Sequence, residues 1–135
     1  MNRQAAMVIH TAMVAGVVMI VVMFAVVRQV SQPEPLTALL WVLRLIALAN
    51  VVGVMVLARI FRSQLGQVDA ADSEDAWWRA NSIPALVVWA LAEGAAFLGA
   101  VFWLLTGDML ILVGVSAVSL MVLVANRPAA LAERD

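Results

Sequence analysis

The chain of 135 residues is far more apolar than a soluble domain of its size: 65% of its residues are hydrophobic and only 13% are charged. Soluble domains have about 45–50% apolar and about 25% charged residues, so this composition excludes an ordinary globular enzyme and a disordered tail. A net charge of −1 leaves no basic tail for nucleic acid, and the absence of cysteine excludes disulfides and thiolate metal sites. With a single histidine as well, we expect neither a metal nor another cofactor. The remaining class is a small integral membrane protein.

Four long apolar segments follow one another along the chain, and each is long enough, or nearly so, to cross a bilayer. Crossing the hydrocarbon takes about 20 mainly apolar residues. Such segments must be helical, because the backbone has to satisfy its own hydrogen bonds there. We therefore expect one integral membrane domain over residues 1–135, an all-α bundle of four transmembrane helices arranged as two hairpins. The expected spans are 5–27, 36–60, 83–105 and 109–125.

The first span ends before a polar turn with two prolines, residues 31–35, which separates it from the second span. His10 lies about 7 Å inside the first span, at 1.5 Å per helical residue. We expect this side chain to form a hydrogen bond between helices, since a lone histidine cannot complete a metal or haem site. Ala12 and Gly16 are small residues four positions apart, and this spacing lets another helix approach closely.

The second span carries Arg44 and Asn50 in its interior. Arg44 is expected about 12 Å inside the membrane. The loop that follows, residues 62–81, is the longest polar segment of the chain, and in it four acidic residues precede Trp77 and Trp78. We expect a short surface helix here, with both indoles at the level of the lipid headgroups, where tryptophan is enriched.

The third span contains Glu93, the only carboxylate within any of the four expected spans. At 1.5 Å per residue, Glu93 lies about 15 Å from the start of the span, close to the midplane. Small residues surround it at helical spacing, and we expect them to pack against other helices. They are Ala92, Ala95, Ala96 and Gly99.

A tight turn of Thr106, Gly107 and Asp108 joins the third and fourth spans. Glycine is typical of the position after a helix, and aspartate is a preferred N-cap of the helix that follows. We therefore expect Gly107 to end one helix and Asp108 to begin the next. The fourth span is the shortest and places Ser119 near mid-depth.

Four polar residues are expected at similar depths in the membrane and form a candidate polar layer. Ionisable side chains within spans are costly, and by default they are candidates for function. In one interpretation, Glu93 and Arg44 form a buried ion pair that joins the second and third spans. In the other, Glu93 has no permanent counter-ion and binds a proton or cation reversibly, or it belongs to a ligand site. The layer consists of Arg44, Asn50, Glu93 and Ser119, with His10 nearer the surface.

Arginine residues are distributed unequally between the two expected membrane surfaces. An even number of spans puts the N-terminus, the middle loop and the C-terminus on one side. Arg28 alone is expected on the other side. Because cytoplasmic loops carry an excess of Lys and Arg, both termini are expected in the cytoplasm, in a bacterial inner membrane. The arginines on the side of the termini are Arg3, Arg59, Arg62, Arg79, Arg127 and Arg134.

Short motifs of this chain resemble those of a family of small uncharacterised bacterial membrane proteins with four helices. That family carries W-A-L-x-E-G on its third helix, L-L-T-G-N before the fourth and R-P after it. The corresponding segments here are WALAEG at 89–94, LLTGD at 104–108 and Arg127-Pro128. This chain departs from the family at Val88, where arginine is usual, and at Asp108, where asparagine is usual. The resemblance implies the same four-helix membrane fold.

A weaker resemblance connects Glu93 with the proteolipid subunits of rotary ATPases. Those subunits are helical hairpins, sometimes duplicated to four spans, with an ion-binding carboxylate in mid-membrane. By this resemblance, Glu93 is the ion-binding residue. The chain departs from proteolipids because Glu93 lies on the first helix of its expected hairpin, and because the first span contains a single glycine, Gly16.

The sequence supports two functions of different kinds. Too few residues lie outside the spans for a catalytic domain, and we do not expect an enzyme. The first function is an accessory or structural subunit of a larger membrane complex, which packs through its Ala and Gly faces against other subunits or further copies of itself. The second is a proton- or ion-binding, proteolipid-like protein or small proton-coupled transporter that uses Glu93.

Overall fold

A computed structural model describes residues 1–65 and 73–131, and all regular secondary structure in this part of the chain is helical. The fold class is therefore all-α. The long helices are α1 (Arg3–Ser31), α2 (Leu40–Ser63), α3 (Glu74–Thr106) and α4 (Met109–Ala125). The short ones are the 3₁₀ helix η1 (Thr37–Leu39) and α5 (Pro128–Leu131).

Three helical segments are long and apolar enough to cross a membrane: α1, the segment formed by η1 and α2, and α3. The fourth long helix, α4, is equally apolar and has 17 residues. Helices of this length and composition indicate a membrane protein.

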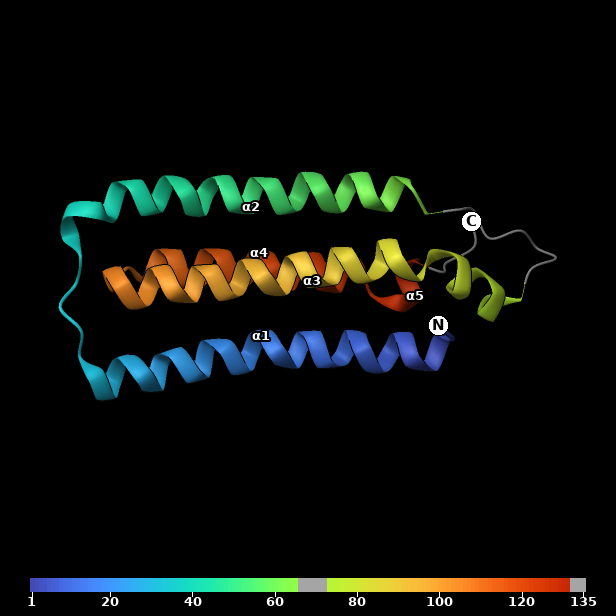
Figure 1. Cartoon of the computed structure of the whole chain (residues 1–135), viewed down its shortest axis with the longest axis horizontal. Coiled ribbons are helices and arrows are strands. Elements are labelled where there is room, and N and C mark those ends of the chain that lie inside the picture. The colour runs from blue at the N-terminus through green and yellow to red at the C-terminus, as the bar shows by residue number, and fades with distance from the viewer. Residues whose placement is uncertain (66–72, 132–135) are drawn as a thin grey trace.

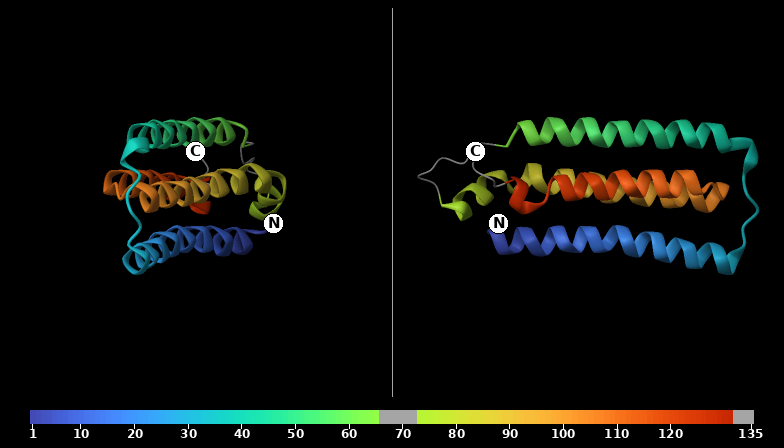
Figure 2. Two further views of the ribbon diagram at one scale, coloured as in Figure 1. Left: turned by 60° about the vertical axis from the view of Figure 1, so that its left-hand side comes forward. Right: turned by 180° about the vertical axis from the view of Figure 1, so that it is seen from behind.

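The long helices are arranged as a central pair with one helix on either side (Figure 1). Helices α3 and α4 form an antiparallel hairpin, and α1 and α2 flank it on opposite sides in all three views (Figures 1 and 2). The helices alternate in direction, so the N-terminus and α5 lie together at what we call the terminal end. The opposite end, called the turn end, holds residues 106–108 and the connection 32–36.

The expected first hairpin is therefore wrong, although the expected α3–α4 hairpin forms. Helices α1 and α2 follow each other in the sequence, but α3 and α4 separate them in space. The connection 32–36 runs across the turn end, where the Leu36 N–H donates to the Leu105 carbonyl at 2.9 Å. Because the connection is extended, it spans the width of the central pair instead of folding α2 back onto α1.

Small residues of α3 allow the other helices to approach it. Ala92 and Ala96 are completely buried, and Gly99 lies so close to α4 that a Cβ placed on it would be 2.7 Å from Val115 Cβ. The flanking helices bury far less: 11% of the apolar stretch of α1 and of α2 is buried, against 44% in α3. An apolar surface of that extent is suited to lipid and not to water.

Helix α3 begins well before the expected start of the third span. Ser73 caps it, because its side chain accepts the Ala76 N–H at 3.2 Å, and acidic residues in the first turn suit the positive end of the helix dipole. Trp77 and Trp78 belong to this helix and are only 4% and 0% exposed. The expected short surface helix is therefore wrong, because both tryptophans belong to α3 and their indoles are packed inside the protein. Pro84 lies within α3, which bends near its start (Figure 1).

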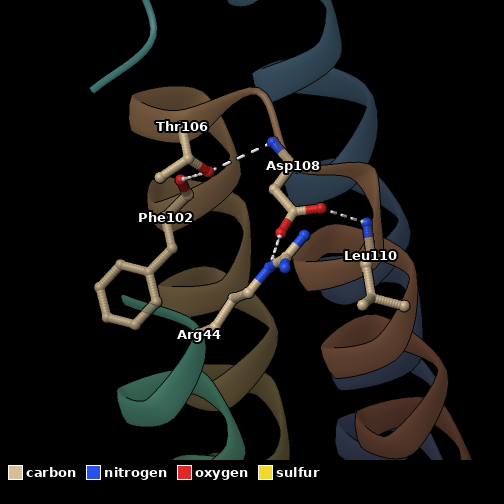
Figure 3. A network of polar contacts seen from close by, with 5 residues as sticks. All are labelled: Arg44, Phe102, Thr106, Asp108 and Leu110. Carbon is tan, nitrogen blue, oxygen red and sulfur yellow. Dashed lines mark hydrogen bonds and ion pairs between the residues drawn. The ribbon is translucent and has the colours of Figure 1, made fainter. Parts of the chain in front are cut away.

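The turn between α3 and α4 is confirmed as expected. Gly107 adopts a left-handed conformation with φ of 73°, and its N–H donates to the Trp103 carbonyl at 2.7 Å. Asp108 caps α4, because its Oδ1 accepts the Leu110 N–H at 3.1 Å. The Thr106 hydroxyl adds two further bonds, donating to the Phe102 carbonyl and accepting the Asp108 N–H (Figure 3). This turn is consequently a rigid attachment point for the flanking helices.

Candidate functional site

Arg44 binds Asp108 and not Glu93. Its Nε lies 2.6 Å from Asp108 Oδ2 (Figure 3). Its guanidinium lies over the Trp41 ring, 5.1 Å from the ring centre. Arg44 is in the second turn of α2, and long side chains on a helix point back toward its N-terminus, here toward the turn end. Glu93 lies about 20 Å from this end along the α3 axis, at 1.5 Å per residue. The expected Arg44–Glu93 ion pair is therefore wrong.

The Arg44–Asp108 pair is partly buried, with the two side chains 32% and 11% exposed. The hydrogen bond from Arg44 holds the pKa of Asp108 below the ordinary carboxyl value, although burial opposes this shift. The Leu110 N–H and the positive charge of Arg44 lower the pKa further. Asp108 is therefore ionised near neutral pH, and its ion pair with Arg44 connects α2 to the turn.

Arg28 makes the equivalent connection for α1. Its Nη1 donates to the carbonyls of Trp103 and Leu104, at 3.1 Å and 2.6 Å, and its guanidinium lies 5.4 Å from the Trp103 ring centre. A cation at the C-terminal end of a helix is favourable, because the last carbonyls carry partial negative charge. A Cβ on Gly107 would overlap the Arg28 guanidinium. This contact is not evident from the sequence, where its one signal is an arginine in the last turn of α1.

Glu93 lies in the seam between α3 and α1, next to Gly16. A Cβ on Gly16 would overlap Glu93 Oε1, so the glycine leaves the room that the carboxylate occupies. Glu93 is half-buried, and in the described part of the chain it has neither a hydrogen bond nor an ion pair. Of the expected small pair on α1, Gly16 makes the close approach, whereas Ala12 is exposed.

The expected polar layer does not form one network. Arg44 is engaged at the turn end, and Glu93 faces α1. Asn50 Oδ1 and Ser119 Oγ are buried on α2 and α4 without a hydrogen-bond partner among the described residues. Ser119 is 1% exposed, so its hydroxyl has no access to bulk solvent.

His10 forms an interhelical hydrogen bond, as expected. Its Nε2 lies 2.9 Å from the Leu123 carbonyl of α4, and its ring packs edge-on against Trp89 of α3 at 5.2 Å. Trp89 in turn donates its indole N–H to the Asn126 carbonyl at 2.8 Å. These contacts join α1, α3 and α4 one helical turn from Glu93 toward the terminal end.

A pocket of about 260 Å³ opens at the terminal end beside His10. Arg3 and Arg127 bring two guanidinium groups to it, and Thr11 a hydroxyl. The remaining lining residues are Met7, Pro128 and Ala129. Among residues 1–65 and 73–131, no three His, Asp or Glu side chains come together at a distance that would hold a metal ion.

Comparisons of the chain with protein-family models, with curated proteins and with solved structures found no match. The fold defines a small helical protein with helices of membrane length. The function of the protein is therefore inferred from the geometry around Glu93.

Proposed function

We propose that this chain is a multi-pass protein of the bacterial inner membrane in which Glu93 takes up and releases a proton. The observation that carries the proposal is a half-buried carboxylate with no partner in the described structure, far from both ends of the bundle. An ionised carboxylate without a counter-ion is costly in a low-dielectric environment. A proton removes that cost, and Glu93 therefore changes its charge state when it functions.

The two arginines at the turn end, Arg28 and Arg44, are engaged elsewhere, which favours proton binding at Glu93 over an ion pair. Arg44 is bound to Asp108, and Arg28 is bound to the carbonyls that end α3. Both lie at the turn end, and helix α4 contributes no ionisable side chain between Met109 and Ala125. A proton is then the simplest species that can neutralise Glu93.

The distribution of arginines supports a cytoplasmic location for the terminal end. Only Arg28 and Arg44 belong to the turn end, whereas the helix termini that carry most other arginines lie at the terminal end. Arg134 falls outside the described residues. The positive-inside rule then places the N-terminus and α5 in the cytoplasm. The arginines of the terminal end are Arg3, Arg59, Arg62, Arg79 and Arg127.

Labelling with a hydrophobic carbodiimide tests the proposal, because this reagent reacts with protonated carboxyl groups in an apolar environment. The protein in detergent is treated across a range of pH, and modified residues are located by peptide mass spectrometry. We expect one modified residue, Glu93, labelled more slowly as the pH rises, and no labelling in Glu93→Gln. Asp108 is the matched internal control, since its ion pair with Arg44 keeps it ionised. A folded protein that resists labelling at every pH contradicts the proposal.

A subunit of a larger membrane assembly is a second candidate, favoured by a groove of about 360 Å³ between α2 and α4. The Ala and Gly residues expected at a partner interface are used inside the chain, since Ala92, Ala95, Ala96 and Gly99 are buried. The groove is instead a free surface with small residues at its floor, including Ala47 and Gly114. Native mass spectrometry after mild detergent extraction tests this candidate, and a protein that is always monomeric and alone contradicts it.

A further inference from the structure

We propose that Glu93 exchanges its proton with the compartment at the terminal end, by way of His10, and that the other half of the α1–α3 seam is closed. This inference rests on the proposed proton binding at Glu93. It adds a direction of access and a second residue that carries the proton.

The half of the seam toward the terminal end is short and begins at a pocket with polar lining residues. The pocket beside Arg3 and Arg127 is lined by His10, and the His10 ring contacts Trp89, which precedes Glu93 by one turn of α3. Gly16 is the residue of α1 that faces Glu93. The distance along α1 from His10 to Gly16 is about 9 Å at 1.5 Å per residue. The polar pocket and His10 therefore lie nearer to the carboxylate than the turn end does.

His10 can carry a proton without leaving its position. A carbonyl oxygen only accepts hydrogen bonds, so the bond to Leu123 requires that Nε2 donates. The Nδ1 lone pair is then the site that accepts a proton, and the bond to Leu123 survives protonation. Histidine is the side chain whose ordinary titration range lies near neutral pH, and this chain has one.

The half of the seam toward the turn end is long and apolar. Phe97, one turn beyond Glu93 on α3, meets Phe24 of α1 edge-to-face at 5.6 Å. Beyond them, Ala100 and Trp103 are 0% and 7% exposed, and the Arg28 guanidinium covers the Trp103 ring. The distance from Gly16 to Arg28 along α1 is about 18 Å, twice that to His10. Water enters a cavity only where polar groups can bind it, so this half excludes a path for protons.

Few charged groups face the two proton-binding side chains. Around His10 these are Arg3 and Arg127 in the pocket, and Arg3 is itself paired with Glu74 at 3.2 Å. No carboxylate contacts His10 in the part of the chain that the structure describes. Toward Glu93, α1 offers His10, Arg28 and the paired Arg3, and all three lie toward the ends of the seam. Helix α2 offers the paired Arg44 and the exposed Arg59 and Arg62, and α4 has no ionisable residue. The response to pH therefore belongs to His10 and Glu93.

Carbodiimide labelling in sealed vesicles tests the direction of access. A protease-sensitive tag placed after Asp135 identifies which side of each vesicle preparation carries the termini. The pH is then varied on one side at a time, over roughly two units around the ordinary titration range of histidine. We expect labelling of Glu93 to follow the pH on the side of the termini and to ignore the pH on the other side. Labelling that follows the opposite side overturns the inference.

His10→Gln tests the role of the histidine. The glutamine amide can still donate to the Leu123 carbonyl but does not titrate, so we expect the response of labelling to a pH jump to slow by about tenfold or more. Thr37→Val is the control, because this exposed threonine lies at the turn end, far from the pocket, and its response should equal that of the wild type. Helical content and labelling in detergent, where there are no sides, show that His10→Gln is folded. A response unchanged in His10→Gln overturns the role of His10.

The same measurements separate the failure of this inference from the failure of the proposed function. If Glu93 is never labelled, even in detergent, proton binding at Glu93 is itself wrong. If Glu93 is labelled with a pH dependence in detergent but follows the wrong side in vesicles, only the direction of access is wrong.

Discussion

Replacing Asp108 by asparagine and by alanine separates the two roles of this residue. Oδ1 accepts the Leu110 N–H that begins α4, and Oδ2 accepts the hydrogen bond from Arg44. Asparagine keeps the helix cap and removes the charge, whereas alanine removes both. Loss of an aspartate cap costs about 1 kcal/mol of unfolding free energy.

The magnitude of the charge effect follows from the burial of the pair. Exposed ion pairs contribute roughly 0–1 kcal/mol, whereas removing one partner of a fully buried pair costs roughly 3–5 kcal/mol. With side chains 32% and 11% exposed, the Arg44–Asp108 pair lies between these limits. We therefore expect Asp108→Asn to lower the unfolding free energy by about 1–2 kcal/mol, and Asp108→Ala by about 2–3 kcal/mol.

The pH dependence has a definite sign. Because the pKa of Asp108 is lowered in the folded protein, the contribution of the pair is complete above the unfolded-state value, near 3.8, and is lost as the pH falls through the lower folded-state pKa. The difference in unfolding free energy between the wild type and Asp108→Asn should thus be constant near neutral pH and disappear in strong acid.

The assay is denaturant unfolding of the protein in detergent, followed by circular dichroism, with Arg44→Leu completing a double-mutant cycle. An Asp108→Asn protein as stable as the wild type at neutral pH, or a coupling energy near zero in the cycle, refutes the contribution of the ion pair. Equal stabilities of the Asn and Ala variants refute the contribution of the cap.

Four further substitutions test the turn, the contact between α3 and α4 and the surroundings of Glu93. Gly107→Ala should lower the unfolding free energy by about 1–2 kcal/mol, because alanine is strained in the left-handed conformation. The loss should be larger still, because the new Cβ displaces the Arg28 guanidinium. Thermal unfolding in detergent measures this effect. Gly99→Ala should lower the unfolding free energy by about 1–2 kcal/mol, because the new Cβ would collide with Val115. Gly114→Ala is the control: it has open space around it and should raise the unfolding free energy slightly. Equal effects of the two substitutions would contradict the close approach of α4 to Gly99. Glu93→Gln should change the unfolding free energy by less than about 1 kcal/mol, since no partner loses its charge, and a collapse of the protein would reveal a partner of Glu93.

Local features of the chain were determined by the sequence alone. The apolar segments predict helices, because a backbone in hydrocarbon must satisfy its own hydrogen bonds. Thr106, Gly107 and Asp108 predict the turn between α3 and α4, because a left-handed glycine and an aspartate cap act on their nearest neighbours in the chain. Glu93 is conspicuous as a carboxylate in an apolar segment, whatever surrounds it.

The tertiary structure decided which residues meet. Arg44 and Glu93 were expected at similar depths because they lie at similar distances from the ends of their expected spans. In the structure, α2 starts at Leu40 and α3 at Glu74, so Arg44 lies at the turn end, away from Glu93. Hydropathy locates the apolar part of a helix and not its ends, so Trp77 and Trp78 were assigned to a separate surface helix although they are buried in α3.

Contacts between distant segments were equally out of reach of the sequence. The placement of α1 and α2 on opposite sides of the central pair depends on the connection 32–36 crossing the turn end, and a short polar segment fits a hairpin equally well. The free carboxylate of Glu93 depends on Gly16 facing it and on Arg28 lying elsewhere. These contacts depend on where each helix starts, how it is rotated about its axis and how it is tilted. Hydrophobic periodicity does not report these quantities here, because every face of an almost entirely apolar helix has the same composition.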